Sequence, residues 1–197
     1  MNDKTIKIIN FINTVQFCTR EQVQQVYFKN TSIRYCNKYL SNLVDNKMLK
    51  RKYYNLGFNS NPYVYYTDKR PNKRILTHDL LVTDAIIGFM SSFSIKEITK
   101  SPVISDVVPD AILVVRTGYS LQPILIEVQL SKHDCFSKYY DFSQKFKKYS
   151  NLDQKPILYV VTNLDIDSKK LLDVNVVVDD LSMSKIRGIL KNAKNYK

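Results

Sequence analysis

The sequence has few of the residues that cofactor and metal motifs require. Only four glycines occur in 197 residues. None belongs to a Gly-rich phosphate loop of the GxxxxGK or GxGxxG type, which argues against an ATPase or a dinucleotide enzyme. The three cysteines, Cys18, Cys36 and Cys135, lie far apart and form no CxxC pair. We therefore expect neither a disulfide framework nor a zinc site, and we expect all three thiols to be reduced.

Long hydrophobic runs are also missing. No apolar run approaches the roughly 20 residues that a membrane-spanning helix requires. Residues 1–4 lead into an amphipathic stretch without the apolar block or the small-residue cleavage site of a signal peptide. Hydrophobic residues make up 44% and charged residues 24% of the chain, which is typical of a globular protein. The expected location is the cytoplasm, with no membrane partner.

Acidic residues are scarce in the first part of the chain. Residues 1–76 carry 14 Lys and Arg against four Asp and Glu, whereas residues 77–197 carry 16 against 14. Most of the net charge of +12 therefore lies in the first part, which predicts a polyanionic partner, and double-stranded DNA first of all. The step in charge also predicts two domains, residues 1–68 and 77–197, joined by a basic, proline-interrupted linker over residues 69–76.

The first domain has helical apolar spacing over residues 4–16, and again after Thr19 and Thr31, each of which is predicted to be a helix N-cap. The third helix is expected to end near residue 46 and to bury Ile33, Cys36 or Asn37, Leu40, Leu43 and Val44. Two β-rich segments, residues 47–54 and 63–67, flank a Gly/Asn/Pro turn and predict a hairpin. This order of three helices and a two-stranded wing resembles the winged helix-turn-helix family.

A recognition helix buries one face and presents short polar or cationic groups to base edges and phosphates. The outward face of the third helix is predicted to carry Ser32, Arg34, Tyr35, Lys38, Ser41 and Asn42. At the base of the wing, phosphate contacts are predicted for Lys50, Arg51 and Lys52. Tyr53 and Tyr54 either contact the nucleic acid or pack across the strands of the hairpin. The alternative is that these cations bind nothing and form an ordinary solvent-exposed surface. Against it, the cations recur across helix, wing and linker with few acids beside them.

From residue 77 the pattern changes to a mixed α/β order. Thr77 is a cap candidate for an apolar-rich helix over residues 77–90. Three consecutive strands are expected at residues 94–98, 107–115 and 123–130. The remaining elements are expected at residues 132–150 (helix), 156–162 (strand), 168–172 (helix), 174–178 (strand) and 182–195 (helix). The fold class predicted for the whole chain is therefore mixed α/β or α+β.

Two short motifs in this second domain resemble those of the PD-(D/E)xK nuclease superfamily, whose core has the order αβββαβ. Pro109-Asp110 matches the first motif, and Glu127-Val128-Gln129 matches the second except that Gln129 replaces the usual lysine. The resemblance implies that Asp110 and Glu127 hold Mg²⁺ for phosphodiester attack by water, with Gln129 beside them. Gln129 cannot supply positive charge. The cation would then come from Lys132, Lys138 or Lys145, or the fold would have lost catalysis and retained DNA binding. The alternative to a site is that Asp110 is a turn residue and Glu127 a surface acid.

The full chain also resembles the replication-relaxation proteins of plasmids, phages and mobile elements. The matching features are the winged-helix order, His78-x-Leu80 with Asp84, Pro109-Asp110, Glu127-x-Gln129, Lys138-Tyr139, Lys145 and Tyr149. The resemblance implies a DNA-binding protein that acts in plasmid or phage replication or transfer, with replication or transfer proteins as further partners. It also suggests a site role for His78. The alternatives are a Mg²⁺-dependent endonuclease, and a transcriptional repressor that binds a palindromic site as a homodimer.

Overall fold

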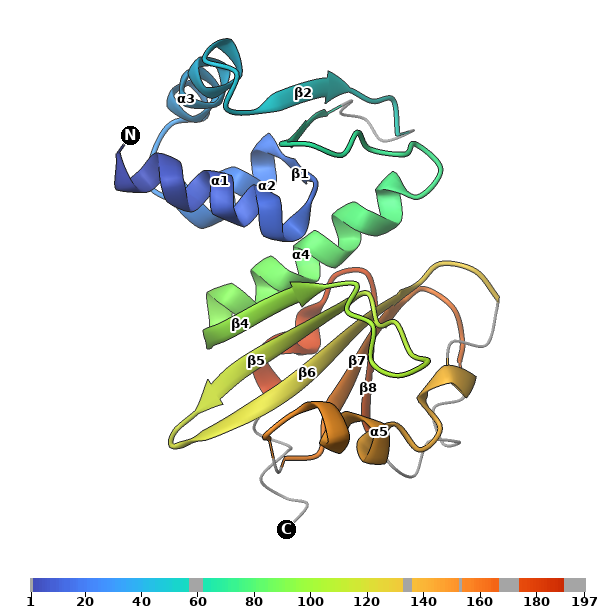
Figure 1. Ribbon diagram of the computed structural model, residues 1–197. Helices are drawn as coiled ribbons and strands as arrows, with labels where there is room; N and C mark the ends of the chain where they lie inside the picture. The colour runs from blue at the N-terminus through green and yellow to red at the C-terminus, as the bar shows by residue number, and fades with distance from the viewer. Residues whose placement is uncertain (1, 57–61, 133–135, 153, 167–173, 190–197) are drawn as a thin grey trace. The chain divides into compact units, whose positions relative to one another are not determined.

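The computed structural model describes residues 2–56, 62–132, 136–152, 154–166 and 174–189. Within these residues the chain is a mixed α+β protein with five α-helices, one sheet of three strands and one of five (Figure 1). It forms two compact units, Met1–Ile87 (unit 1) and Gly88–Lys197 (unit 2). The two units divide within helix α4 (Leu76–Ser92), later in the chain than residues 69–76. None of the described helices is long and apolar enough to cross a membrane.

Unit 1 begins with three helices and contains the three-stranded sheet. Its elements before α4 are α1 (Asp3–Val15), β1 (Cys18–Thr19), α2 (Arg20–Tyr27), α3 (Ile33–Asp45), β2 (Lys50–Tyr53) and β3 (Tyr63–Tyr66). The sheet order is β1-β3-β2, and both pairings are antiparallel. The turn expected between β2 and β3 includes residues 57–61, which lie outside the described residues.

Side-chain caps set the helix starts in unit 1. The predicted cap Thr19 is confirmed: its hydroxyl accepts from the Gln22 N–H, while the Gln22 side chain accepts from the Thr19 N–H, so the two form a capping box. The prediction of Thr31 as the cap of α3 is wrong, because Ser32 caps that helix. The buried stripe of α3 consists of Cys36, Leu40 and Leu43, whereas the expected core residue Ile33 is exposed.

The start of α4 packs into unit 1. Leu76 and Leu80 belong to a buried cluster with Phe17, Tyr54, Val64 and Tyr66. The Tyr54 hydroxyl donates to the Pro71 carbonyl at 3.0 Å, and Pro71 is itself buried. The segment between β3 and α4 therefore packs against the hairpin of unit 1.

Unit 2 is built around the five-stranded sheet. Its strands are β4 (Ser94–Lys100), β5 (Ala111–Thr117), β6 (Ser120–Gln129), β7 (Ile157–Thr162) and β8 (Asn175–Asp179), in the order β4-β5-β6-β7-β8. The first three strands are antiparallel neighbours, and β6, β7 and β8 are parallel to one another (Figure 1). Side chains alternate between the two sheet faces. On β7, Leu158 and Val160 join the cluster around α5 (Phe142–Tyr149), and Tyr159 contacts Phe89 of α4 at 5.2 Å between ring centroids.

Three expected elements differ from the structure. The helix expected over residues 132–150 is divided into the 3₁₀ turn η1 (Ser137–Tyr139) and α5, because Asp141 has a left-handed backbone with φ of 57° that interrupts a helix. The strand expected from residue 107 begins at Ala111, since Ile104 and Val107 form an isolated bridge in the preceding loop. The expected helix over residues 168–172 lies outside the described residues, and the described part of 182–195 contains the 3₁₀ turn η3 (Ser184–Gly188).

Candidate nucleic-acid interface and acid site

The outward face of α3 carries cationic and polar side chains at helical spacing. Arg34, Lys38 and Asn42 are exposed at intervals of four residues, on the side opposite the buried stripe. Tyr35 is also exposed and contacts Phe28 edge-on at 5.8 Å. The Ser32 hydroxyl accepts from the Tyr35 N–H as the helix cap. The face therefore offers two cations and an amide from one rigid element.

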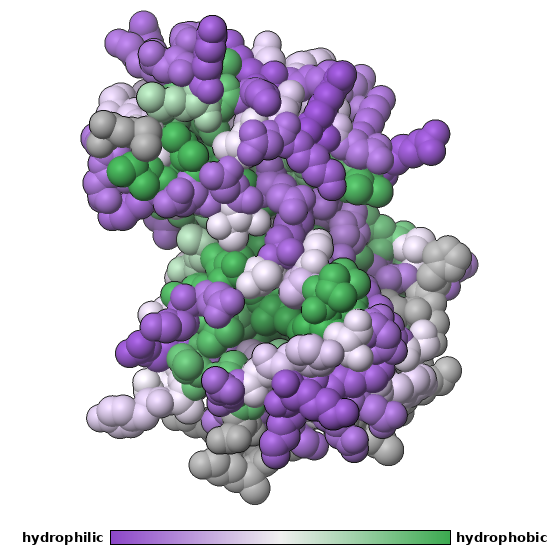
Figure 2. Space-filling model, viewed as in Figure 1, coloured by the Kyte–Doolittle hydropathy of each residue, from purple (hydrophilic) through white to green (hydrophobic). Residues whose placement is uncertain are grey.

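The cations of β2 connect to this face through one side-chain contact. Lys50 and Arg51 are exposed and Lys52 is half-buried. The Arg51 guanidinium donates from Nη1 to Ser41 Oγ at 3.3 Å, and its central carbon lies 5.0 Å from the ring centroid of Tyr63. The face of unit 1 seen in Figure 2 is largely hydrophilic, with smaller hydrophobic areas. We call the five cations of these two elements, Arg34, Lys38, Lys50, Arg51 and Lys52, the basic surface. Arg51 joins β2 to α3, and Lys50 and Lys52 lie on the other face of the strand.

In unit 2 the sheet brings Asp110 close to Glu127. Ala111 pairs with Ile126, and Ile112 pairs with Leu125. Asp110 immediately precedes this paired stretch, and its negative charge acts on the carboxyl of Glu127. Asp110 Oδ2 accepts from the Val128 N–H at 2.8 Å, while its own N–H donates to the Ile126 carbonyl. Asp110 is therefore held immediately before β5, beside Glu127.

Glu127 is buried, and two donors from η1 hold its carboxylate. Lys138 Nζ donates to Oε1 at 2.7 Å, and the Tyr139 hydroxyl donates to Oε2 at 2.7 Å. Lys138 Nζ also donates to the Val108 carbonyl at 3.1 Å, so it joins η1 to the loop before β5. Both carboxylate oxygens of Glu127 are thus hydrogen-bonded within the protein.

The pKa of Glu127 is raised above its ordinary value of 4.5. Burial is the largest cause, and the negative charge of Asp110 adds to it. The Lys138 ammonium and the Tyr139 hydroxyl oppose the rise by stabilising the ionised carboxylate. The arrangement is therefore a pair of interacting acids with an internal cation beside one of them.

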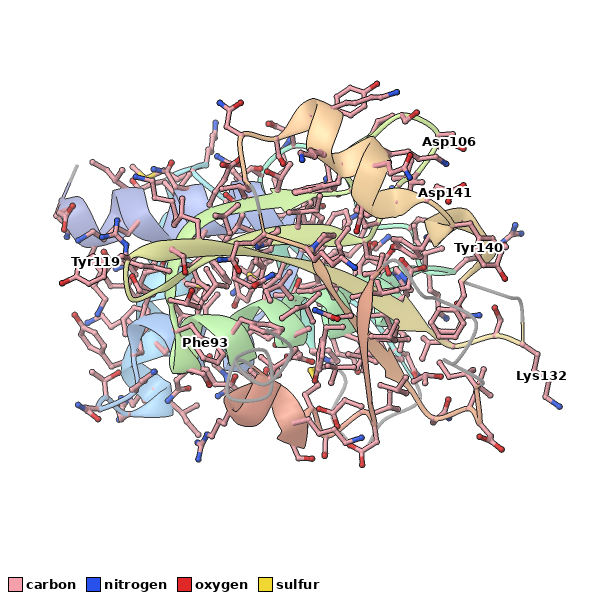
Figure 3. All side chains as sticks on the ribbon, turned by 90° about the horizontal axis from the view of Figure 1, so that it is seen from below. Phe93, Asp106, Tyr119, Lys132, Tyr140 and Asp141 are labelled. Atoms are coloured by element: carbon pink, nitrogen blue, oxygen red, sulfur yellow. The ribbon has the colours of Figure 1, made fainter. Side chains whose placement is uncertain are left out.

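Of the three candidate lysines, only Lys138 reaches the acid pair. Lys132 lies beyond β6 with its side chain pointing outward (Figure 3). Lys145 forms an ion pair with Asp106 at 2.7 Å. The Gln129 side chain is buried and donates to the Ser131 carbonyl. The sequence analysis included Tyr139 among the features of the family resemblance but gave it no site role, because its contact with Glu127 depends on the position of η1.

The described residues fit an internally compensated acid pair better than a metal centre. No group of three or more His, Cys, Asp or Glu side chains among them is arranged to hold a metal ion. A divalent cation at Glu127 would have to replace the hydrogen bonds from Lys138 and Tyr139, because both carboxylate oxygens already accept. The ammonium provides the compensating charge that a buried carboxylate requires.

His78 is a further candidate from the sequence, and Glu97 is an acid of the same sheet as Glu127. His78 is half-buried in the first turn of α4, within unit 1. Glu97 is exposed on the edge strand β4, where it accepts from the Thr99 hydroxyl at 3.3 Å.

Comparison with protein-family models, with curated proteins and with solved structures finds no match for this chain. Its function is therefore inferred from the two sites themselves.

Proposed function

We propose that this chain is a sequence-directed binding protein for double-stranded DNA. In this proposal unit 1 is a winged helix-turn-helix module, unit 2 is a nuclease-like module that binds without cleaving, and the protein acts in plasmid or phage DNA replication or transfer. The observation that carries the proposal is the basic surface of α3 and β2, where five cations lie on two adjacent elements.

The element order of unit 1 supports this assignment. Helix α3 precedes the β2–β3 hairpin, and β1 completes the sheet beside β3. A helix that buries Cys36, Leu40 and Leu43 can present Arg34 and Lys38 to base edges, while cations on the adjacent strand contact phosphates. Phosphate contacts provide affinity, and contacts from α3 provide sequence preference.

The Glu127 environment supports a non-cleaving role for unit 2. Cleavage by a metal-dependent nuclease uses carboxylates that are available to the metal. Here Lys138 and Tyr139 use both oxygens of Glu127, and Gln129 stands where the resembled motif has a lysine. The ion pair joins η1 to β6 and requires no metal.

A binding-site selection with the full chain tests the proposal. Random duplexes are selected on the protein, and the affinities of the enriched and the scrambled sequence are compared. We expect the enriched duplex to bind at least tenfold more tightly, and Arg34→Ala or Lys38→Ala to reduce that ratio, since one good base contact discriminates by about 1–3 kcal/mol. Lys148→Ala, which removes an exposed cation of α5, is the matched control. Equal affinity for all duplexes would refute sequence-directed binding.

A Mg²⁺-dependent endonuclease is the second candidate, because the carboxyl groups of Asp110 and Glu127 interact electrostatically. Supercoiled and linear DNA are incubated with the protein and Mg²⁺, Mn²⁺ or EDTA. The proposed binding role predicts no cleavage in any of these conditions. Divalent-dependent cleavage that Asp110→Asn and Glu127→Gln both abolish would establish the endonuclease instead. Gln129→Lys tests whether the usual cation of the motif restores activity.

A further inference from the structure

A pocket beside the end of β2 combines cationic and aromatic side chains. It has a volume of about 410 Å³ and lies wholly within unit 1. Two segments line it: the end of β2 with the residues that follow, and the segment before α4. The lining residues are Lys52, Tyr53, Tyr54, Asn55, Arg70, Pro71, Asn72 and Lys73. Three of them are cations and none is an acid, so the pocket favours an anion.

The walls of the pocket are fixed by packing and by hydrogen bonds. Tyr54 is buried, and its hydroxyl bond to the Pro71 carbonyl joins the two segments. Lys52 Nζ lies 5.5 Å from the centroid of the Tyr54 ring. On the opposite side, the Asn72 side chain accepts from the Arg74 N–H at 3.1 Å, which shapes the turn that carries Lys73. These contacts hold Lys52 and Lys73 on facing segments.

Tyr53, which also lines the pocket, is an exposed aromatic residue. Half of its surface is exposed, and its ring contacts Tyr63 edge-on at 5.8 Å, which orients the ring. Every nucleobase has a flat face that stacks on such a ring, and stacking requires a base that is not already paired within a duplex. The volume lies within the range of small-ligand pockets and is far too small for a double helix.

We propose that this pocket binds an unpaired nucleotide of single-stranded DNA, with Lys52, Arg70 and Lys73 around its phosphate and Tyr53 against its base. This inference rests on the proposed function, because it adds a single-stranded contact next to the duplex-binding surface of β2. The substrate class becomes duplex DNA with an adjoining single-stranded region, as at a fork or an opened end.

The test compares one duplex in blunt form with the same duplex carrying a 5′ or 3′ tail of about six nucleotides, a length within the range that small folds cover. Affinity is measured by fluorescence anisotropy with the full chain. We expect a tail to tighten binding about tenfold, which lies within the contribution of one stacked base. Arg70→Ala/Lys73→Ala should abolish the gain, and Lys96→Ala/Lys148→Ala, which removes two exposed cations of unit 2, should retain it.

A second pair of variants tests the ring. Tyr53→Phe should retain the gain from the tail and Tyr53→Leu should lose it, because only the former keeps the stacking surface. The inference is overturned if neither tail tightens binding, or if Arg70→Ala/Lys73→Ala keeps the full gain. The affinity for the blunt duplex distinguishes the two proposals. If the blunt duplex binds tightly and a tail adds no affinity, only the proposal for the pocket is refuted. If tailed DNA or single strands bind but the blunt duplex does not, only the proposed duplex binding is refuted.

Discussion

Glu127 is a buried carboxyl group beside a second acid, and hydrogen bonds from two neighbouring side chains compensate for this unfavourable environment. Its carboxyl lies in an apolar run of β6, where burial favours the neutral form, and Asp110 stands beside it. The two donors from η1 offset this cost by binding both oxygens of the ionised form. The protonation of one side chain is therefore linked to the position of a segment ten residues further along the chain.

The raised pKa of Glu127 gives stability a defined dependence on pH. Between 4.5 and the higher pKa of the folded state, the native protein binds more protons than the unfolded chain at this site, so stability falls as pH rises. Glu127→Gln removes this titration. We expect the stability of the wild type relative to Glu127→Gln to be greatest below pH 4.5 and to decline above it, as measured by urea unfolding at a series of pH values. A constant or rising difference would contradict the raised pKa.

Lys138→Met removes the cation that stabilises the ionised carboxylate. At pH 7 we expect a loss of about 1–3 kcal/mol, less than for a fully buried pair because 33% of the Lys138 side chain is exposed. The double variant Glu127→Gln/Lys138→Met should recover part of the lost unfolding free energy, since it leaves no uncompensated buried charge. Lys145→Met is the control, because its partner Asp106 is largely exposed and such a pair contributes little. Equal losses at both lysines would exclude a special role for Lys138.

At this scale the sequence predicted part of the acid site. Strand alternation predicted that Glu127 and Gln129 face one side, with Asp110 approaching from the neighbouring strand. In the structure Asp110 immediately precedes β5 and interacts electrostatically with Glu127. The sequence left three lysines as candidates and gave no site role to Tyr139. Which lysine contacts Glu127 depends on the path of the chain after β6, where η1 replaces the expected helix. That path is determined by tertiary packing and cannot be predicted from the local sequence pattern.

Helix α2 shows how one side chain can join several elements. Gln22 is 3% exposed; its Oε1 completes the capping box with Thr19, and its Nε2 donates to the Leu80 carbonyl and to Asp84 Oδ1 at 2.9 and 2.7 Å. The pKa of Asp84 is raised by burial and lowered in part by this bond. Gln22 therefore ties the start of α2 to the first turns of α4 within unit 1.

Gln22→Ala should destabilise unit 1 by about 2 kcal/mol, because it leaves the buried Leu80 carbonyl and Asp84 without this donor and removes half of the capping box. Gln25→Ala, on the exposed side of the same helix, should change the unfolding free energy by less than about 0.5 kcal/mol. Both are measured by urea unfolding at pH 7. The interpretation fails if the two losses are equal.

The sequence predicted most of the described elements and missed their less regular parts. Apolar spacing predicted α1, α2, α3 and the β2–β3 hairpin, because each buries a periodic stripe or alternates across a sheet. The two-residue strand β1 has no periodicity of its own and forms only because β3 pairs with it. The interruption at Asp141 arises from a left-handed backbone at a non-glycine residue, which no composition rule predicts.

At the scale of the whole molecule, the change in net charge and the boundary between the two structural units fall at different positions in the sequence. The net charge changes at about residue 76, whereas unit 1 continues to Ile87 because Leu76, Leu80 and Gln22 join the start of α4 to it. Charge depends on the solvent-facing residues, and compactness depends on the buried ones. The basic character of unit 1 therefore belongs to its surface elements and not to α4.

The salt dependence of DNA binding tests whether unit 1 carries the phosphate contacts. If about six phosphates are contacted, affinity should fall roughly 10³-fold between 50 and 200 mM salt. Lys50→Ala/Arg51→Ala/Lys52→Ala should flatten the slope of log K against log salt, by as much as about 2.7 if each cation neutralises one phosphate.

The matched control for this experiment is Lys96→Ala/Lys147→Ala/Lys148→Ala, which removes the same formal charge from exposed positions of unit 2. Circular dichroism establishes that both variants are folded, since Arg51 also contacts Ser41 and Tyr63. Net charge acting at long range would flatten both slopes alike, because it depends on the total and not on position. Direct phosphate contacts from β2 instead require that the first variant loses slope while the control keeps it. This outcome would assign duplex binding to the basic surface of unit 1.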